Sequence, residues 1–93
     1  MTPATDASPA FVYLLRCSDG SLYCGWTTDV QRRLREHQAG AASRYTRRRR
    51  PVQVAWWRPM PTRSAAMQEE ARIKRLSRPE KLRLVGTGGA RAD

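Results

Sequence analysis

Acidic residues, histidine and cysteine are all scarce in this sequence. The 93 residues include 8 Asp and Glu, 1 His and 2 Cys. One histidine and two cysteines are too few for a four-ligand zinc site, and two cysteines make no disulfide framework. We therefore expect Cys17 and Cys24 to be reduced and structural, as is usual in cytosolic proteins.

Long apolar runs are also missing. No run approaches the roughly 18 residues that are needed to span a bilayer. The start of the chain, MTPATDASPA, lacks the basic and hydrophobic regions of a signal peptide. We therefore expect a cytoplasmic protein that is not bound to membranes.

Positive charge is abundant by contrast. The chain has 18 Lys and Arg, a formal net charge of +10 and a pI of about 11.2. Such a surplus repels itself unless a polyanion neutralises it, so nucleic acid is the leading partner.

The length allows one small domain, which we expect over residues 11–85, between a disordered lead (1–10) and a flexible tail (86–93). Strands are predicted at 11–16, 21–25 and 52–57, the last of them stopped by Pro59 and Pro61. Capping boxes at Thr28 and Ser77 predict helices over 28–38 and 77–85, and a third helix is expected from 62–64 to 76. The polar segment 41–50 is expected to be an exposed loop. The order β-β-α-β-α-α predicts an α+β fold, a small three-stranded antiparallel sheet flanked by helices.

The turn between the first two strands decides where their tyrosines point. A two-residue Asp-Gly turn would put Tyr13 and Tyr23 on opposite faces of the sheet. A three-residue loop, with Gly20 left-handed in a bulge, pairs Leu15 with Tyr23 and puts the tyrosines on one face. We prefer the second register, which also turns the two cysteines to opposite faces.

Two helices carry polar residues beside their apolar stripes. In the first helix, Arg33 and His37 fall on the same side as Val30 and Leu34, so they either meet partners in the fold or edge the stripe and reach solvent. In the helix after residue 62, Glu70 lies inside an apolar arc and Glu69 at its margin. Glu70 could pair with Lys or Arg, or bind a metal. The arc consists of Ala66, Met67, Ala71 and Ile73.

Elimination narrows the chemistry, because the other acids fall in tails, a turn, helix starts or a solvent face. Only Glu69 and Glu70 remain, which argues against a two-metal phosphodiesterase site, and adjacent helical residues point too far apart for a glycosidase pair. What remains is at most a one-metal site with tyrosine, histidine and arginine as partners.

A basic cluster with an aromatic residue lies in the segment 41–50. It suits phosphate contacts with a base stacked on the ring, and it could equally be a solvated loop. The candidate substrate-binding residues are Arg44, Tyr45, Arg47 and Arg48. Trp56 and Trp57 alternate in a strand, so we expect one in the core and the other half exposed.

Taken together, these motifs resemble the GIY-YIG nuclease domain, in particular its compact stand-alone UPF0213 group. The signatures are represented by Phe11-Val12-Tyr13 and Tyr23-Cys24-Gly25, the arginine and histidine by Arg33 and His37 in RRLREH, and the glutamate by Glu70 in EEARIKRL. Phe11 replaces the first signature's glycine, Trp26 stands where some branches have lysine, and the chain contains no asparagine.

The resemblance implies the GIY-YIG fold and a metal-dependent nuclease. Its substrate would be DNA rather than RNA, in DNA repair or processing. The protein would be associated with the nucleoid when it is bound to DNA. It implies that both tyrosines face the active site. Glu70 would then hold one divalent cation, Mg²⁺ or Mn²⁺, and Tyr13 or Tyr23 would be the general base with His37 as proton acceptor. Arg33 would contact the phosphoryl oxygens. The alternatives are a nucleic-acid-binding module without catalysis and a basic adaptor for a protein partner.

Overall fold

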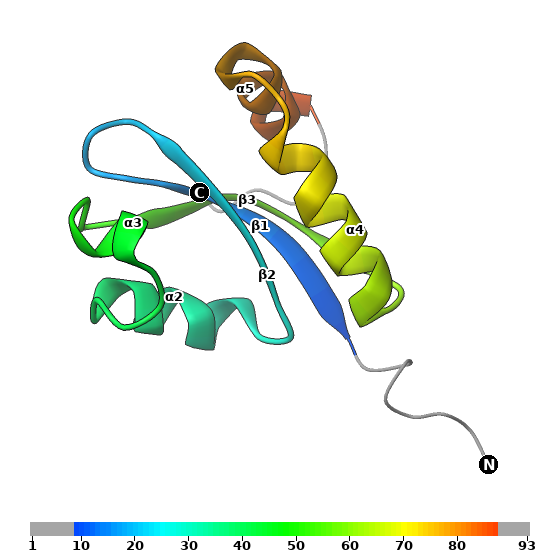
Figure 1. Ribbon diagram of the computed structural model, residues 1–93, viewed down its shortest axis with the longest axis horizontal. Helices are drawn as coiled ribbons and strands as arrows, with labels where there is room; N and C mark the ends of the chain where they lie inside the picture. Colours follow the sequence, from blue (N-terminus) through cyan, green and yellow to red (C-terminus); the bar gives the residue numbers. More distant parts are fainter. Residues whose placement is uncertain (1–8, 88–93) are drawn as a thin grey trace.

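The computed structural model describes residues 9–87 and confirms the predicted α+β fold (Figure 1). The sheet is antiparallel, with strand order β2-β1-β3. Most of the expected lead and tail lies outside the described residues; β1 already begins at Ala10, and α5 continues to Thr87. The elements in chain order are β1 (Ala10–Arg16), β2 (Leu22–Thr27), α2 (Val30–Gln38), α3 (Arg44–Arg47), β3 (Gln53–Met60), α4 (Arg63–Lys74) and α5 (Arg78–Thr87).

The β1–β2 hairpin has the three-residue loop. Leu15 pairs with Tyr23, and the amide of Cys17 donates to the carbonyl of Ser21 at 2.9 Å. Gly20 has φ +85°, which only glycine adopts without strain. Tyr13 and Tyr23 therefore share one face of the sheet, as predicted. The two cysteines are free and buried in different clusters, Cys17 on the face of the tyrosines and Cys24 on the other.

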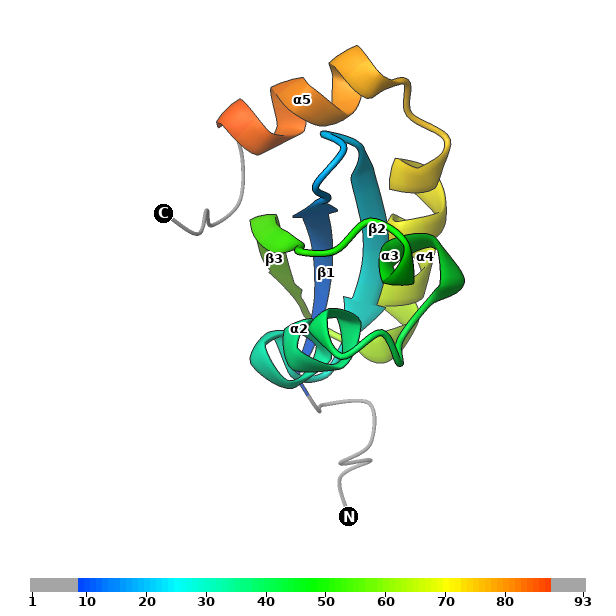
Figure 2. The ribbon, with the colours of Figure 1, turned by 90° about the vertical axis from the view of Figure 1, so that its left-hand side faces the viewer.

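Helices cover the two faces of the sheet differently. α4 and α5 contribute Ala66, Ile73 and Leu84 to an apolar cluster with Leu14 and Trp56. On the other face, α2 packs Val30 and Leu34 against a cluster that contains Tyr13, Leu15 and Val54. Figure 2 shows α2 and α3 on the near side of the sheet and α4 on the far side. Trp56 is fully buried and Trp57 partly exposed, as expected.

Side-chain caps fix the helix starts. Ser77 and Glu80 form the predicted reciprocal capping box, with bonds of 2.8 and 3.3 Å. Thr62 caps α4 through the amide of Ala65. The prediction that Thr28 caps α2 is wrong by one residue, because the carboxylate of Asp29 accepts from the amide of Arg32.

Three further expectations are corrected. β3 continues through Pro59 to Met60; it is an edge strand, and edge strands tolerate a residue without an amide proton. The segment 41–50 is not simply a loop, because it contains α3, and Thr46 is completely buried. Met67 and Ala71 are exposed, since the buried stripe of α4 runs through Ala66 and Ile73, seven residues apart.

Candidate active site

A small polar cleft of ≈ 110 Å³ opens beside β2, between α2 and α4. It brings together all five residues that were predicted as catalytic, which come from both strands of the hairpin and from both helices. Arg33 and His37 therefore meet partners in the fold rather than only edging the stripe of α2. The lining residues are Tyr13, Tyr23, Gly25, Trp26, Arg33, His37, Ala42 and Glu70.

A chain of buried hydrogen bonds begins at Tyr13. Its hydroxyl lies 2.9 Å from Nε2 of His37, and Nδ1 of His37 lies 2.7 Å from Oγ1 of Thr46. The Thr46 hydroxyl donates to the carbonyl of Ser43 at 3.4 Å, so it is free to accept from an Nδ1–H. Nε2 then carries the lone pair, and the Tyr13 hydroxyl donates to it.

Burial sets the protonation of this pair. His37 is 1% exposed, and its burial, reinforced by Arg33, lowers the pKa of the imidazole below its usual value. Burial, with smaller contributions that include Tyr23, raises the pKa of Tyr13 far above that of a free tyrosine. At neutral pH the cleft therefore holds a neutral imidazole that accepts a hydrogen bond from a neutral phenol.

Gly25 makes room for the Tyr13 hydroxyl. The two residues pair across β1 and β2, and a Cβ on Gly25 would collide with the phenol, lying 2.6 Å from its Cζ. Any side chain at position 25 would displace Tyr13 from His37. The glycine of the second signature thus has a steric reason here.

Tyr23 occupies a more open position than Tyr13. Its ring meets the His37 ring edge-on at 5.3 Å between centroids and stacks on Tyr45 at 5.8 Å. Among residues 9–87, no group hydrogen-bonds to its hydroxyl, whereas the Tyr13 hydroxyl is held by His37. The two tyrosines therefore differ in whether a histidine can accept the proton of the hydroxyl.

Adjacent glutamates on α4 have different surroundings. Glu69 is clamped by Arg58 at 2.9 Å and Arg72 at 2.7 Å, and these bonds, first those from Arg72, lower the pKa of its carboxyl. Glu70 lines the cleft and has one ion-pair partner, Lys74, at 3.4 Å. Glu69 fastens α4 to β3, and Glu70 is the carboxylate available for chemistry.

Arg33 is half-exposed at the wall of the cleft and is oriented by Glu36, with Nη1 and Oε1 2.8 Å apart. One bond leaves most of the guanidinium donors open to a phosphate.

Among residues 9–87, no three His, Cys, Asp or Glu side chains gather closely enough to hold a metal ion by themselves.

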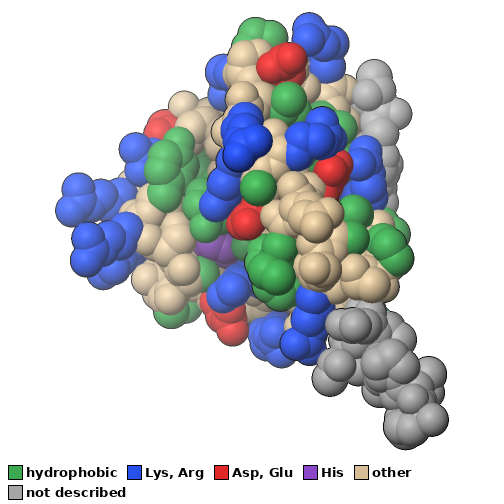
Figure 3. Space-filling view, turned by 45° about the vertical axis from the view of Figure 1, so that its right-hand side comes forward, with side chains coloured by type: hydrophobic (Ala, Val, Ile, Leu, Met, Phe, Trp, Pro, Cys, Tyr) green, Lys and Arg blue, Asp and Glu red, His purple; other side chains and the backbone are tan. Residues whose placement is uncertain are grey.

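The predicted substrate-binding residues line a separate, larger hollow of ≈ 690 Å³ around α3. Arg49 belongs to it as well, and its guanidinium lies 3.8 Å from the centre of the Tyr45 ring. Because Tyr45 also stacks on Tyr23, the hollow and the cleft adjoin. Figure 3 shows the purple histidine among hydrophobic, basic and acidic side chains.

Sequence reasoning missed three neighbours of the cleft. Thr46 holds His37, Lys74 pairs with Glu70, and Trp26 forms part of the wall. Lys74 follows Glu70 by four residues, a spacing that could have indicated the pair. No local pattern links Thr46 to His37.

Comparison with known proteins shows the family. The GIY-YIG catalytic domain matches residues 9–83. An UPF0213 protein of Haloquadratum walsbyi is 50% identical over 78 residues, 84% of this chain and 88% of the relative. Another, from Listeria monocytogenes, is 52% identical over 75 residues, 81% and 83% of the two chains.

Two solved structures are similar. The solution NMR structure of the UPF0213 protein BH0048 from Bacillus halodurans has a TM-score of 0.57 at 41% identity, covering 88% of this chain and 87% of that one. The protein EF2693 from E. faecalis has a TM-score of 0.58 at 34% identity, over 96% and 98% of the two chains. No helix within residues 9–87 is long and apolar enough to cross a membrane.

Proposed function

This chain belongs to the GIY-YIG catalytic domain family, and we propose that it is a metal-dependent nuclease that hydrolyses phosphodiester bonds. Its preferred substrate is DNA, and it acts in DNA repair or processing. One observation carries the proposal: a neutral histidine, two tyrosines, an arginine and a glutamate line one cleft of a chain with a net charge of +10.

The residues of the cleft fit one Mg²⁺ or Mn²⁺. Mg²⁺ is commonly held by one or two carboxylates, with waters and substrate phosphate oxygens as its other ligands. Glu70 provides one partly exposed carboxylate at the wall, and the ammonium of Lys74 at 3.4 Å balances its charge when no cation is present. A cation bound there would neutralise the scissile phosphate and its leaving oxygen.

Tyr13 is the better placed general base. Its oxygen can take a proton from a water while its own proton passes to Nε2 of His37, 2.9 Å away. The two transfers together avoid a free phenolate, whose formation the raised pKa of Tyr13 opposes. The Thr46 hydroxyl keeps the imidazole in the tautomer that can accept. Tyr23 has no such acceptor among the described residues, and we assign it to orienting the water or the phosphate.

Arg33 and the hollow around α3 bind the substrate. Arg33 contacts the phosphoryl oxygens, where negative charge builds as the water attacks. Arg44, Arg47 and Arg48 contact neighbouring phosphates, and Tyr45 offers a ring for stacking. Because Tyr45 touches Tyr23, a strand held there reaches the cleft.

Cleavage of a labelled panel tests the proposal. Single-stranded, duplex, flap and branched DNA, and RNA, are incubated with Mg²⁺, Mn²⁺ or EDTA, using wild type and Glu70→Ala. The expected result is cutting that needs the metal and Glu70, with a DNA form cut fastest. No cutting of any substrate by a folded wild-type protein would overturn it.

A nucleic-acid-binding module without catalysis is the second candidate. It is favoured by the single carboxylate of the cleft, already paired with Lys74, and by the absence of a three-residue metal cluster within residues 9–87. It predicts strong, metal-independent and steeply salt-dependent binding with no cleavage.

A further inference from the structure

A second hollow, of ≈ 300 Å³, adjoins the candidate active site. It shares Trp26 and Arg33 with the cleft, so a group bound in it would lie next to the reacting phosphate. None of the residues that belong to it alone takes part in the proposed chemistry. We call it the Trp26 subsite; it consists of Trp26, Thr27, Thr28, Arg32, Arg33 and Arg63.

The Trp26 subsite is positively charged. Three arginines line it, and no carboxylate does. Arg32 and Arg33 share a single acid, Glu36, at 3.8 and 2.8 Å. Arg63 makes no ion pair with any residue in the described range 9–87. An anion in the subsite would therefore meet uncompensated charge.

One of these arginines lies where it destabilises its own helix. Arg63 is the first residue of α4, which is capped by the neutral Thr62 and has no acid in its first turn. Helix N-termini carry partial positive charge and favour acids, and α2 has one in its cap residue Asp29, whereas α4 has none. The placement of Arg63 is unfavourable for folding and favourable for an anion held beside the start of α4.

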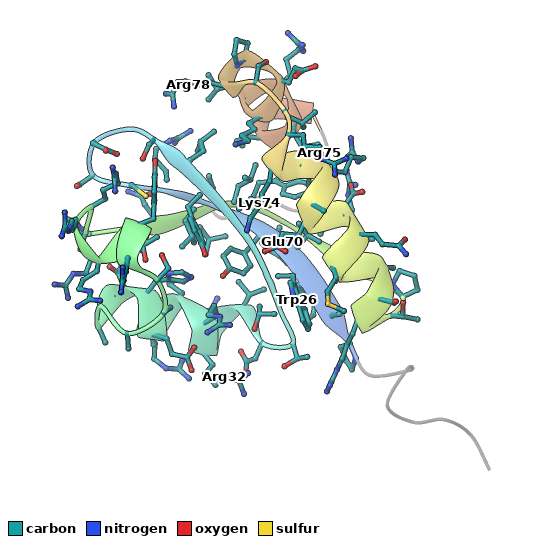
Figure 4. The ribbon with its side chains drawn as sticks, in the orientation of Figure 1. Trp26, Arg32, Glu70, Lys74, Arg75 and Arg78 are labelled. Carbon is teal, nitrogen blue, oxygen red and sulfur yellow. The ribbon has the colours of Figure 1, made fainter. Side chains whose placement is uncertain are left out.

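Trp26 supplies an aromatic surface between the charges and the cleft. It packs partly against the apolar cluster under α4, which fixes the indole, and it lines both cavities. In Figure 4, Trp26 lies between Glu70 and Arg32. A fixed indole beside arginines is the arrangement on which bases of single-stranded nucleic acid stack.

We propose that the Trp26 subsite binds the nucleotide next to the scissile phosphate, with its base unpaired and stacked on Trp26 and its phosphate on the arginines. The inference rests on the proposed function and adds a substrate class: nucleic acid with an unpaired nucleotide beside the cut. In an intact duplex both faces of each internal base are covered by neighbours, so no base face is open to the indole.

Binding in EDTA tests this separately from cleavage. A labelled single-stranded DNA and the matching blunt duplex are titrated with wild type, Trp26→Leu, which keeps apolar packing, and Trp26→Phe, which keeps a ring. Loss of one stacked base corresponds to roughly 5- to 150-fold in affinity. Trp26→Leu should weaken single-strand binding by that factor and leave the duplex unchanged, Trp26→Phe should restore most of it, and Trp57→Leu should have no effect.

An abasic scan identifies the contact. One base is removed at each position of the single strand in turn, and the loss of affinity is measured for wild type and Trp26→Leu. At the stacked position the loss should occur with wild type and disappear in Trp26→Leu. Equal losses in both proteins at every position, or an equal effect of Trp26→Leu on single strand and duplex, would overturn the inference even if the protein proves to be a nuclease. If the protein cleaves no substrate, the same titrations still decide whether an unpaired base stacks on Trp26.

The arginines provide a second readout. Arg63→Gln should raise the melting temperature and lower single-strand affinity, because it removes a charge that opposes the helix and attracts the phosphate. Arg35→Gln makes the same change in the last turn of α2, away from the subsite, and should not raise the melting temperature and should weaken binding less. Equal effects of both variants on affinity would contradict the subsite.

Discussion

The two faces of the sheet bury different kinds of side chain. Under α4 and α5 the fully buried residues are apolar, among them Leu14, Trp56 and Ile73. Under α2 and α3 the buried residues include His37 and Thr46 beside Tyr13. The apolar face stabilises the fold mainly through burial, with the Glu69–Arg58 ion pair joining α4 to β3, whereas the face of α2 keeps polar groups that burial disfavours.

The polar face is tolerated because its groups satisfy one another. Within residues 9–87, no buried side-chain nitrogen or oxygen lacks a hydrogen-bond partner. On this face the bonds run from Tyr13 through His37 to Thr46 and Ser43. We infer that stability depends mainly on the apolar cluster under α4, and reactivity on the polar groups of the α2 face together with Glu70 at the margin of α4. Single substitutions should separate the two.

Tyr13→Phe should have the largest effect on rate. It removes the proposed base and keeps the ring, and general-base catalysis contributes roughly 10²- to 10⁴-fold. The free energy of unfolding should fall by only about 1–3 kcal/mol, because Nε2 of His37 loses a partner. Single-turnover cleavage and urea unfolding measure both quantities. Tyr23→Phe is the matched control and should slow cleavage less; a greater loss in Tyr23→Phe would move the base to that residue.

Ile73→Ala should lower stability and leave the cleavage rate unchanged. Ile73 is fully buried under α4, and truncating such a residue to alanine costs about 2–5 kcal/mol. The rate for folded molecules should be unchanged, because no atom of Ile73 lines the cleft. Denaturant unfolding and single-turnover rates at low temperature check this. If folded Ile73→Ala lost as much cleavage rate as Tyr13→Phe, the two faces would not be separable.

Lowering the pH should reduce stability and cleavage through His37 on the polar face, by less than the two substitutions above. The pKa of His37 is lowered in the folded state, so between about 6.5, its unfolded value, and that lower pKa the unfolded chain binds more protons. Stability from this residue is therefore complete above about pH 6.5 and is lost as the pH falls through the lowered pKa. Cleavage by the folded protein should slow as the pH falls through that lowered pKa, because a protonated imidazole accepts no proton. His37→Gln should unfold with a weaker dependence on pH between 7 and 5, and an unchanged dependence would contradict the assignment.

The apolar face was the easier one to predict. Alternation in FVYLLR and the left-handed requirement at Gly20 define the hairpin register, and both are local properties. α4 shows the limit of such patterns. Met67 and Ala71 look apolar enough for the core, but the sheet contacts only one stripe of the helix, and which stripe it contacts depends on tertiary packing.

The polar face needed more than local patterns. Helical spacing placed Arg33 and His37 on the inner side of α2, and the family motif singled out Glu70. Thr46 could not be found this way, because its burial depends on α3 folding back against α2, and the segment around it is rich in exposed arginine. Trp26 was missed because the cleft forms at the edge of β2, where strand and helix patterns meet, whereas the four-residue spacing of Lys74 from Glu70 could have indicated that pair.

The most direct test of the account compares neighbouring carboxylates on α4. Single-turnover cleavage in Mg²⁺ is measured for wild type, Glu70→Gln and Glu69→Gln, with unfolding followed for each. Glu70→Gln should lose about 10²-fold or more in rate and stay folded. Glu69→Gln should keep its rate and lose stability, because Glu69 joins α4 to Arg58 of β3. Normal cleavage by Glu70→Gln would contradict the account.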